Sequence, residues 1–142
     1  VVPPLPRVRP LNDASALVVL DSAVPRWFDS RGRIGLEQMR ALREHGDTLD
    51  AHGGLVVLWH YAWQAPPGEK MNRVHSLVDM DVLDRLCGDY RGRGDRPIVF
   101  IHGHVHRPWQ FRFEGDLTHV VDINVGSPTR VSCRATWPSR CC

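Results

Sequence analysis

The stretch Pro97-Ile98-Val99-Phe100-Ile101-His102-Gly103-His104-Val105-His106 contains the most informative pattern in this 142-residue chain. Its first half is a run of β-branched and aromatic residues, which predicts a buried strand. A glycine and two histidines spaced i, i+2 follow directly. In an extended segment, His104 and His106 would point to the same face, about 6.5 Å apart along the backbone. Two imidazoles placed in this way can each reach a different ion of a metal pair about 3.5–4 Å apart.

A third histidine, His60, follows a second apolar run. Leu55-Val56-Val57-Leu58-Trp59 comes after Gly53-Gly54 and has the near-continuous apolar composition of a buried parallel strand. Ligands of open α/β sheets bind just beyond the carboxyl ends of strands. His60 and His104 therefore occupy equivalent places on two strands. A single histidine there is more often a residue that caps a strand end, whereas three histidines at two strand ends favour a metal site.

Strands and helices alternate along the sequence, which predicts an α/β fold. The first ten residues are rich in proline and are expected to be irregular. The expected elements are a strand at 16–20, a helix at about 36–49, strands ending at His60 and His104, a helix around 82–86, and an antiparallel pair at 109–114 and 117–125.

These residues resemble those of the calcineurin-like metallophosphoesterases. That family has an isolated histidine after an apolar strand and a Gly-His-x-His motif some forty residues later, and Leu58-Trp59-His60 and Ile101-His102-Gly103-His104-Val105-His106 match this order. Softer matches are a strand ending in Leu20-Asp21-Ser22, the start of a helix at 35–39, and the turn Asn124-Val125-Gly126-Ser127. The resemblance covers about residues 16–129.

The resemblance implies the carboxyl-terminal half of an αββα-sandwich metallophosphoesterase domain at 16–129, between an irregular start at 1–15 and an atypical tail at 130–142. It implies a hydrolase that cleaves phosphomonoesters or phosphodiesters with two divalent ions, Mn, Fe or Zn, in the complete domain. The substrate and the residues that bind it stay unknown, and no catalytic residue is assigned.

The resemblance also implies roles for individual side chains. His60 and His104 would bind one ion, and His106 the other. Three residues behind them would orient the ligand rings: His102, Asp122 and Asn124. A packing role is equally compatible with His102. The remaining histidines, in helical, loop or strand contexts, are expected to have no metal role: His45, His52, His75 and His119.

The family's upstream motif Gly-Asn-His-Asp or Glu does not occur in this sequence. Its other two upstream motifs, Asp-x-His and Gly-Asp-x-x-Asp, are matched in spacing only by the segment 46–52, which overlaps the helix expected at about 36–49 and follows no apolar strand, so Asp50 is not in the family's setting. We therefore expect the missing amino-terminal half of the domain to be the partner of this chain, and the isolated chain to be inactive. Two alternatives stay open. One is a degenerate half that acts as a non-catalytic binding module, and the other is a mononuclear zinc protein with three histidine ligands.

The composition is that of a globular segment with 42% hydrophobic and 24% charged residues. A net charge of +2 with mixed signs gives no signal for nucleic-acid binding. No apolar stretch has the length of a membrane span and no signal peptide is visible, so we expect a cytoplasmic location. Cys133, Cys141 and Cys142 lack the spacing of a zinc site and belong to the atypical tail.

Overall fold

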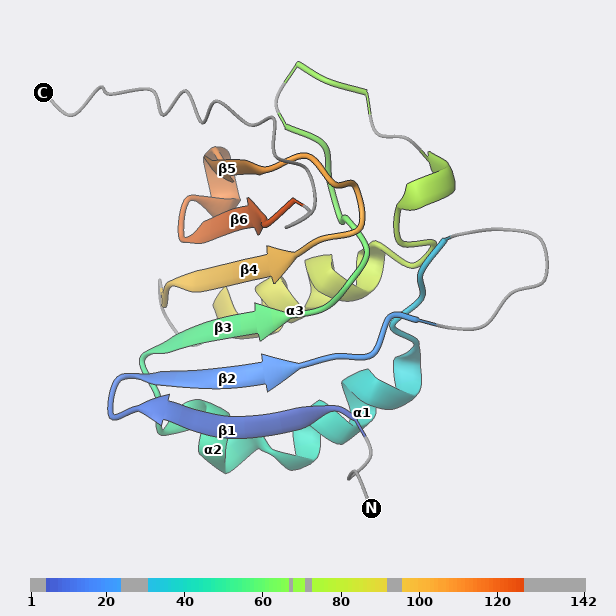
Figure 1. Cartoon of the computed structure of the whole chain (residues 1–142). Coiled ribbons are helices and arrows are strands. Elements are labelled where there is room, and N and C mark those ends of the chain that lie inside the picture. The colour runs from blue at the N-terminus through green and yellow to red at the C-terminus, as the bar shows by residue number, and fades with distance from the viewer. Residues whose placement is uncertain (1–4, 24–30, 67, 71–72, 92–95, 127–142) are drawn as a thin grey trace, which may run out of the picture.

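The computed structural model describes residues 5–23, 31–66, 68–70, 73–91 and 96–126. The order of its elements is shown in Figure 1. The elements are β1 (Arg7–Asn12), β2 (Ser15–Val19), α1 (Leu36–Glu44), α2 (Gly46–Asp50), β3 (Gly54–Leu58), the 3-10 helix η1 (Arg73–His75), α3 (Asp81–Arg91), β4 (Ile98–His102), β5 (Trp109–Arg112), the 3-10 helix η2 (Gly115–Leu117) and β6 (Val120–Asn124).

The strands form one six-stranded sheet in the order β1-β2-β3-β4-β6-β5. The four central strands, β2, β3, β4 and β6, are parallel, and the edge strands β1 and β5 pair antiparallel to them. Three of these central strands, β2, β3 and β4, are near-continuous apolar runs of the sequence, as expected for parallel strands inside a sheet. The expected α/β fold is confirmed.

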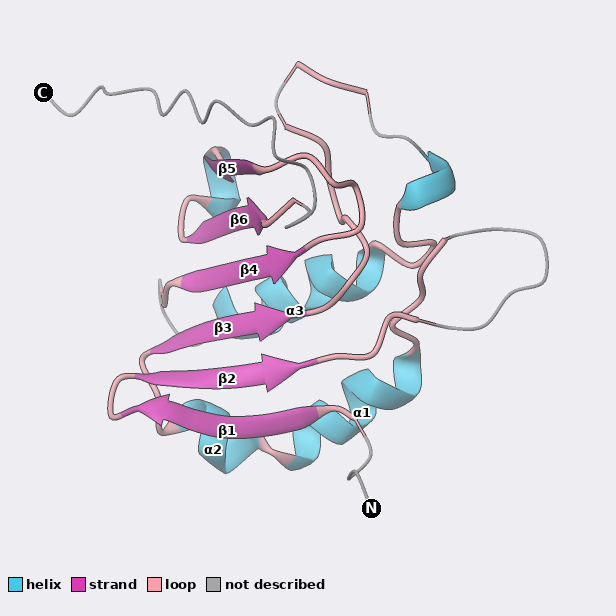
Figure 2. Ribbon diagram, in the orientation of Figure 1, coloured by secondary structure: helices cyan, strands magenta, loops and turns pink. Residues whose placement is uncertain are grey.

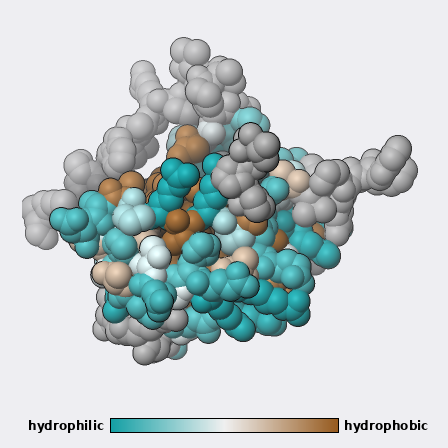
Figure 3. Space-filling model, turned by 90° about the horizontal axis from the view of Figure 1, so that it is seen from below, coloured by the Kyte–Doolittle hydropathy of each residue, from teal (hydrophilic) through white to brown (hydrophobic). Residues whose placement is uncertain are grey.

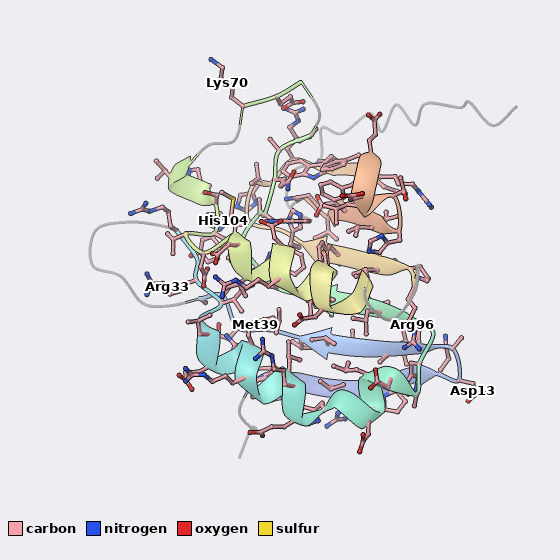
Figure 4. All side chains as sticks on the ribbon, turned by 180° about the vertical axis from the view of Figure 1, so that it is seen from behind. Asp13, Arg33, Met39, Lys70, Arg96 and His104 are labelled. Atoms are coloured by element: carbon pink, nitrogen blue, oxygen red, sulfur yellow. The ribbon has the colours of Figure 1, made fainter. Side chains whose placement is uncertain are left out.

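One face of the sheet is covered by helices. In Figure 2 the helices α1, α2 and α3 lie behind the strands, and Figure 4, drawn from behind, shows them in front. The helices contribute Leu42, Leu49, Val82, Leu83, Leu86 and Cys87 to the core. The sheet contributes alternate residues of its central strands: Ala16, Val18, Leu55, Val57, Ile98, Phe100 and Val120.

The intervening residues of the same strands point to the opposite face, and they are also apolar. The strand register aligns them in two rows across the sheet. All eight are partly exposed, and no helix of the described chain covers them. We call these residues the open face: Leu17, Val56, Val99 and Val121 in one row, and Val19, Leu58, Ile101 and Ile123 in the other.

Charged residues border the open face on both edge strands. Arg9 of β1 is paired with Leu17, and Arg112 of β5 is paired with Val121, so each continues a row of the open face. Both arginines are exposed. Figure 3 views the molecule from the β1 side, where hydrophobic side chains reach the surface among hydrophilic ones. An apolar sheet face of this kind is typical of a surface that packs against another layer.

The structure corrects three expectations about the elements. Residues Arg7–Asn12 are not irregular but form β1, and Pro10 is tolerated there because an edge strand can lack one ladder hydrogen bond. The helix expected at 36–49 is divided at His45, directly before Gly46, a poor helix former. β3 and β4 end at Leu58 and His102, two residues earlier than expected. The cysteine tail lies outside the described residues.

None of the helices in the described ranges combines the length and the apolar character needed to cross a membrane.

Candidate functional site at the ends of β3 and β4

The segments that leave β3 and β4 are tied together by main-chain hydrogen bonds. The N–H of Trp59 donates to the carbonyl of Ile101 at 3.2 Å, which extends the parallel pairing beyond β3. The N–H of Gly103 donates to the carbonyl of His60 at 3.0 Å. The chain segments bearing His60 and His104 therefore lie side by side, as the sequence predicts.

Three imidazole rings form a row at this edge of the sheet. Nδ1 of His104 lies 3.1 Å from Nε2 of His60, and Nε2 of His104 lies 3.1 Å from Nδ1 of His75. The ring of Tyr61 lies against His104, with 4.2 Å between the ring centroids. Figure 4 marks the position of His104 beside the end of α3 nearest this edge. The partly buried ring of His104 is thus in contact with three other rings.

His75 is the residue of this row that the sequence pattern does not single out. It belongs to η1, in the long connection between β3 and α3. An isolated parallel bridge between Ala62 and Ser76 brings that connection back to the end of β3. Neither the spacing of His75 nor its local composition indicates this return, so the sequence offered no signal for it.

The backbone around the Gly-His-x-His motif is not extended. His104 and His106 have φ angles of 68° and 57°, and among the described residues they are the only two non-glycine residues with positive φ. The expectation that they project from an extended strand is therefore wrong. Each left-handed residue costs about 1–2 kcal/mol, and strained conformations of this kind cluster at functional sites.

All three predicted histidines line one pocket at the sheet edge. His106 reaches it from an exposed position in the loop after β4. Leu58 and Ile101 of the open face line the same pocket. The pocket is therefore continuous with the open face, and a layer that covered this face would also form a wall of the pocket.

The environment of His104 keeps its imidazole neutral. The pKa of His104 is lowered to about 4, first by burial and then by the nearby His60, His75 and His106, because a second positive charge beside them is unfavourable. A neutral imidazole has a free lone pair, which is the form that binds a metal ion. His104 is therefore deprotonated and competent as a ligand at neutral pH.

The three residues expected behind the histidines form one buried network. Nε2 of His102 lies 3.0 Å from Asp122 Oδ1, and the side-chain amide of Asn124 lies 3.2 Å from Nδ1 of His102. Because Nδ1 of His102 accepts from this amide, its Nε2–H donates to the carboxylate. The indole N–H of Trp109 donates to the same carboxylate at 3.0 Å.

This network supports the backbone of the site. The amide of Asn124 also donates to the carbonyl of Gly103 at 2.8 Å, and its Oδ1 accepts from the N–H of Gly126 at 2.9 Å. The hydrogen bonds of His102, Asp122 and Asn124 thus run to each other, to Trp109 and to main-chain groups around the motif. Their contribution is to position the loop that contains the ligand candidates.

Ser22 performs a similar task for His60. It is buried, and its Oγ accepts hydrogen bonds from the backbone N–H of His60 at 3.1 Å and of Tyr61 at 3.4 Å. The sequence indicated Ser22 only through its place in the Leu-Asp-Ser strand end. The structure gives that serine a definite role in fixing the turn at the end of β3.

The described residues fit a metal ion in part. Two nitrogen ligands of a tetrahedral ion, each about 2.0–2.1 Å from the metal, lie roughly 3.3 Å apart, close to the 3.1 Å between His60 Nε2 and His104 Nδ1. Within the described ranges, however, no group of three or more His, Cys, Asp or Glu side chains is arranged to hold a metal. The described residues thus include a pair of candidate ligands but no complete centre.

Comparisons with known proteins show the fold. No family model matches this sequence, and no curated protein matches it. Its structure is similar to a solved structure titled "Structure of PhoD", with a TM-score of 0.63 at 13% sequence identity, covering 87% of this chain and 29% of that one. The chain therefore spans less than a third of the length of PhoD, and its mixed α/β fold with a six-stranded sheet is similar to part of the PhoD structure.

Proposed function

We propose that this chain is part of a metal-dependent phosphoesterase that hydrolyses phosphomonoesters or phosphodiesters. The observation that carries the proposal is the pair of ring nitrogens, His60 Nε2 and His104 Nδ1, 3.1 Å apart at the carboxyl ends of neighbouring parallel strands. The similar fold of PhoD, an alkaline phosphatase, supports a hydrolase of this class.

The proposed roles of the histidines follow their places in the pocket. His60 and His104 hold one ion through facing nitrogens, and His106 reaches a second ion from the exposed side of the pocket. Imidazole ligands suit Mn, Fe or Zn. When bound, such ions polarise the phosphoester and supply a nucleophile at neutral pH. The residues of this chain would provide the imidazole ligands at this edge of the sheet.

The carboxylates that a two-ion site needs are proposed to come from a layer that covers the open face. Eight apolar side chains on this face lack a covering helix in the described chain, and the pocket is continuous with them through Leu58 and Ile101. Arg9 and Arg112 border the face on opposite edges, so a complementary layer would be apolar in the middle and acidic at its margins. The missing amino-terminal half implied by the family resemblance is the proposed source.

A non-catalytic binding module is the second candidate function. The observation that favours it is the lack of any complete metal-binding group among the described residues. The two candidates differ in what the covering layer adds. In the phosphoesterase it completes a metal site, whereas in the binding module it forms an interface only.

Metal binding tests the proposal. The 142-residue chain is titrated with Zn²⁺ or with Co²⁺, whose absorption spectrum reports nitrogen coordination. We expect the binding of an ion that His60→Ala and His104→Ala each abolish and that His45→Ala leaves unchanged, because His45 is exposed between α1 and α2. A chain that binds Co²⁺ no better than the His60→Ala variant would overturn the metal assignment and favour the binding module.

A further inference from the structure

The position of His75 is fixed by two backbone bridges. Directly after it, Ser76 pairs with Ala62 and Leu77 pairs with Gly32, both in isolated parallel bridges. Ser76 and Leu77 are both buried. His75 is therefore placed against the site by residues that are anchored on two neighbouring segments, although it comes from a long connection.

Both ring nitrogens of His104 are engaged by other imidazoles. His75 faces Nε2 and His60 faces Nδ1, each at 3.1 Å. A neutral imidazole has one N–H and one lone pair, so its two nitrogens cannot both serve as ligands of an ion. A ligating histidine usually donates its other N–H to a neighbouring group, and that bond fixes both its tautomer and its ring orientation.

We propose that His75 is a positioning residue that selects Nδ1 of His104 as the ligand nitrogen. In this arrangement the Nε2–H of His104 donates to Nδ1 of His75. The lone pair of His104 Nδ1 then faces His60 Nε2, and an ion between these two nitrogens is held by both. The metal part of this inference rests on the proposed function, whereas the choice of tautomer does not.

Tyr61 and the buried network near His104 cannot make this choice. Tyr61 contacts the ring of His104 with 4.2 Å between centroids, which limits its tilt but does not distinguish one nitrogen from the other. The buried network of His102 and Asn124 has its hydrogen bonds to main-chain groups around the motif. In the described structure, His75 is the residue in contact with Nε2 of His104.

The tautomer can be measured directly in the metal-free chain. Two-bond ¹⁵N–¹H correlation spectra of chain with ¹⁵N-labelled histidines, recorded at pH 7.5, distinguish Nε2–H from Nδ1–H rings. We expect His104 to be an Nε2–H tautomer in the wild-type chain. A His104 ring found as Nδ1–H in the wild-type spectrum overturns the proposal without any variant.

Variants of His75 separate positioning from general packing. His75→Ala should give a mixture of His104 tautomers and weaken Co²⁺ or Zn²⁺ binding about 10–100-fold. In His75→Asn, the side-chain oxygen can take the place of Nδ1 and accept the hydrogen bond from the Nε2–H of His104. This variant should restore the Nε2–H tautomer of His104 and most of the affinity for the metal ion. His45→Ala is the control for loss of a histidine and should change neither readout.

The outcomes distinguish this inference from the proposed function. A tautomer of His104 that is the same in wild type and in a folded His75→Ala variant overturns the positioning role, even if the wild-type chain binds metal. A tautomer that depends on His75 in a chain that binds no Co²⁺ supports the positioning role and overturns the metal assignment. If His75→Ala does not fold, the wild-type tautomer and the His75→Asn variant decide.

Discussion

Nε2 of His60 and Nδ1 of His104 lie 3.1 Å apart although 44 residues separate the two histidines in sequence. The contact depends on the parallel pairing of β3 and β4, which brings the ends of both strands to one edge of the sheet. It is then fixed by the hydrogen bond between the two main chains, from Gly103 N–H to His60 O. Two ligand candidates are thus held by backbone structure, which makes their separation insensitive to surface loops.

The first prediction concerns the division of the histidines between two ions. In a protein that contains this chain and its covering layer, His60→Ala and His104→Ala should reduce the occupancy of the same metal site, and His106→Ala that of the other, because the former two face each other and the latter reaches the pocket from the exposed loop. Metal content by mass spectrometry of the purified variants measures this. Equal loss of both ions from His104→Ala and His106→Ala would instead favour the mononuclear alternative.

The second prediction concerns the buried network beneath the motif. Asp122→Ala should lower the free energy of unfolding by about 3 kcal/mol or more, because it leaves the N–H groups of His102 and Trp109 without their acceptor, at about 1–3 kcal/mol each. Urea unfolding followed by circular dichroism measures the change. Asp13→Ala, at an exposed turn, is the control and should change stability by no more than about 0.5 kcal/mol.

The third prediction concerns pH. The pKa of His104 is lowered from 6.5 to about 4 in the folded chain, so the unfolded chain binds more protons between these values. Stability is therefore complete above about pH 6.5 and falls as the pH decreases toward about 4. Urea midpoints measured between pH 7.5 and 4 should fall less steeply for His104→Gln than for wild type. His45→Gln is the control, and an equal slope for wild type and His104→Gln would contradict this assignment.

The fourth prediction concerns the open face. Val56→Thr and Val99→Thr together should make the chain more soluble and reduce its binding of the dye ANS, because threonine keeps the β-branched shape that suits a strand while reducing the exposed apolar surface. The control is Val57→Thr on the helix-covered face, which should destabilise the chain because it buries a hydroxyl group in the core. Unchanged ANS binding by the double variant would show that the open face is not an accessible apolar surface.

Much of the fold could be predicted from the sequence because three of its central strands are nearly continuous apolar runs. Such runs identify β2, β3 and β4 without knowledge of their partners. β1 was not predicted because Arg7–Asn12 contains charged residues and a proline. A strand tolerates these residues at the edge of a sheet, and the sequence does not indicate that position. The antiparallel pairing of β5 with β6 was predicted from the turn between them and is confirmed.

The candidate site could be predicted where its residues follow strand ends. It could not be predicted where it depends on the long connection between β3 and α3 packing against the end of β3. His60 and His104 could be paired in advance because parallel strands place their carboxyl ends together. The contact of His75 depends on the bridge between Ala62 and Ser76, and no local pattern specifies that bridge. The left-handed backbone of His104 and His106 was also missed, because the strand was expected to continue through Gly103 to His104, whereas β4 ends at His102.

The last prediction is that the isolated chain has no phosphoesterase activity and that activity appears when the covering layer is supplied. Imidazoles alone do not offset the repulsion between two divalent ions or bridge them, and in the described part of the chain no metal-binding group is complete. A layer on the open face would form a wall of the same pocket, since Leu58 and Ile101 belong to both. Carboxylates on that layer would therefore be placed beside His60 and His104.

The measurement is hydrolysis of bis-p-nitrophenyl phosphate with Mn²⁺ or Zn²⁺, by the 142-residue chain alone and by a protein in which the upstream half is joined to it. We expect turnover only from the joined protein, reduced strongly by His104→Ala and unchanged by His45→Ala. The joined protein should also lose the ANS binding of the isolated chain, because the same layer covers the apolar rows. Turnover by the isolated chain that His106→Ala abolishes would show that the described half is sufficient, and that the covering layer contributes no essential ligand.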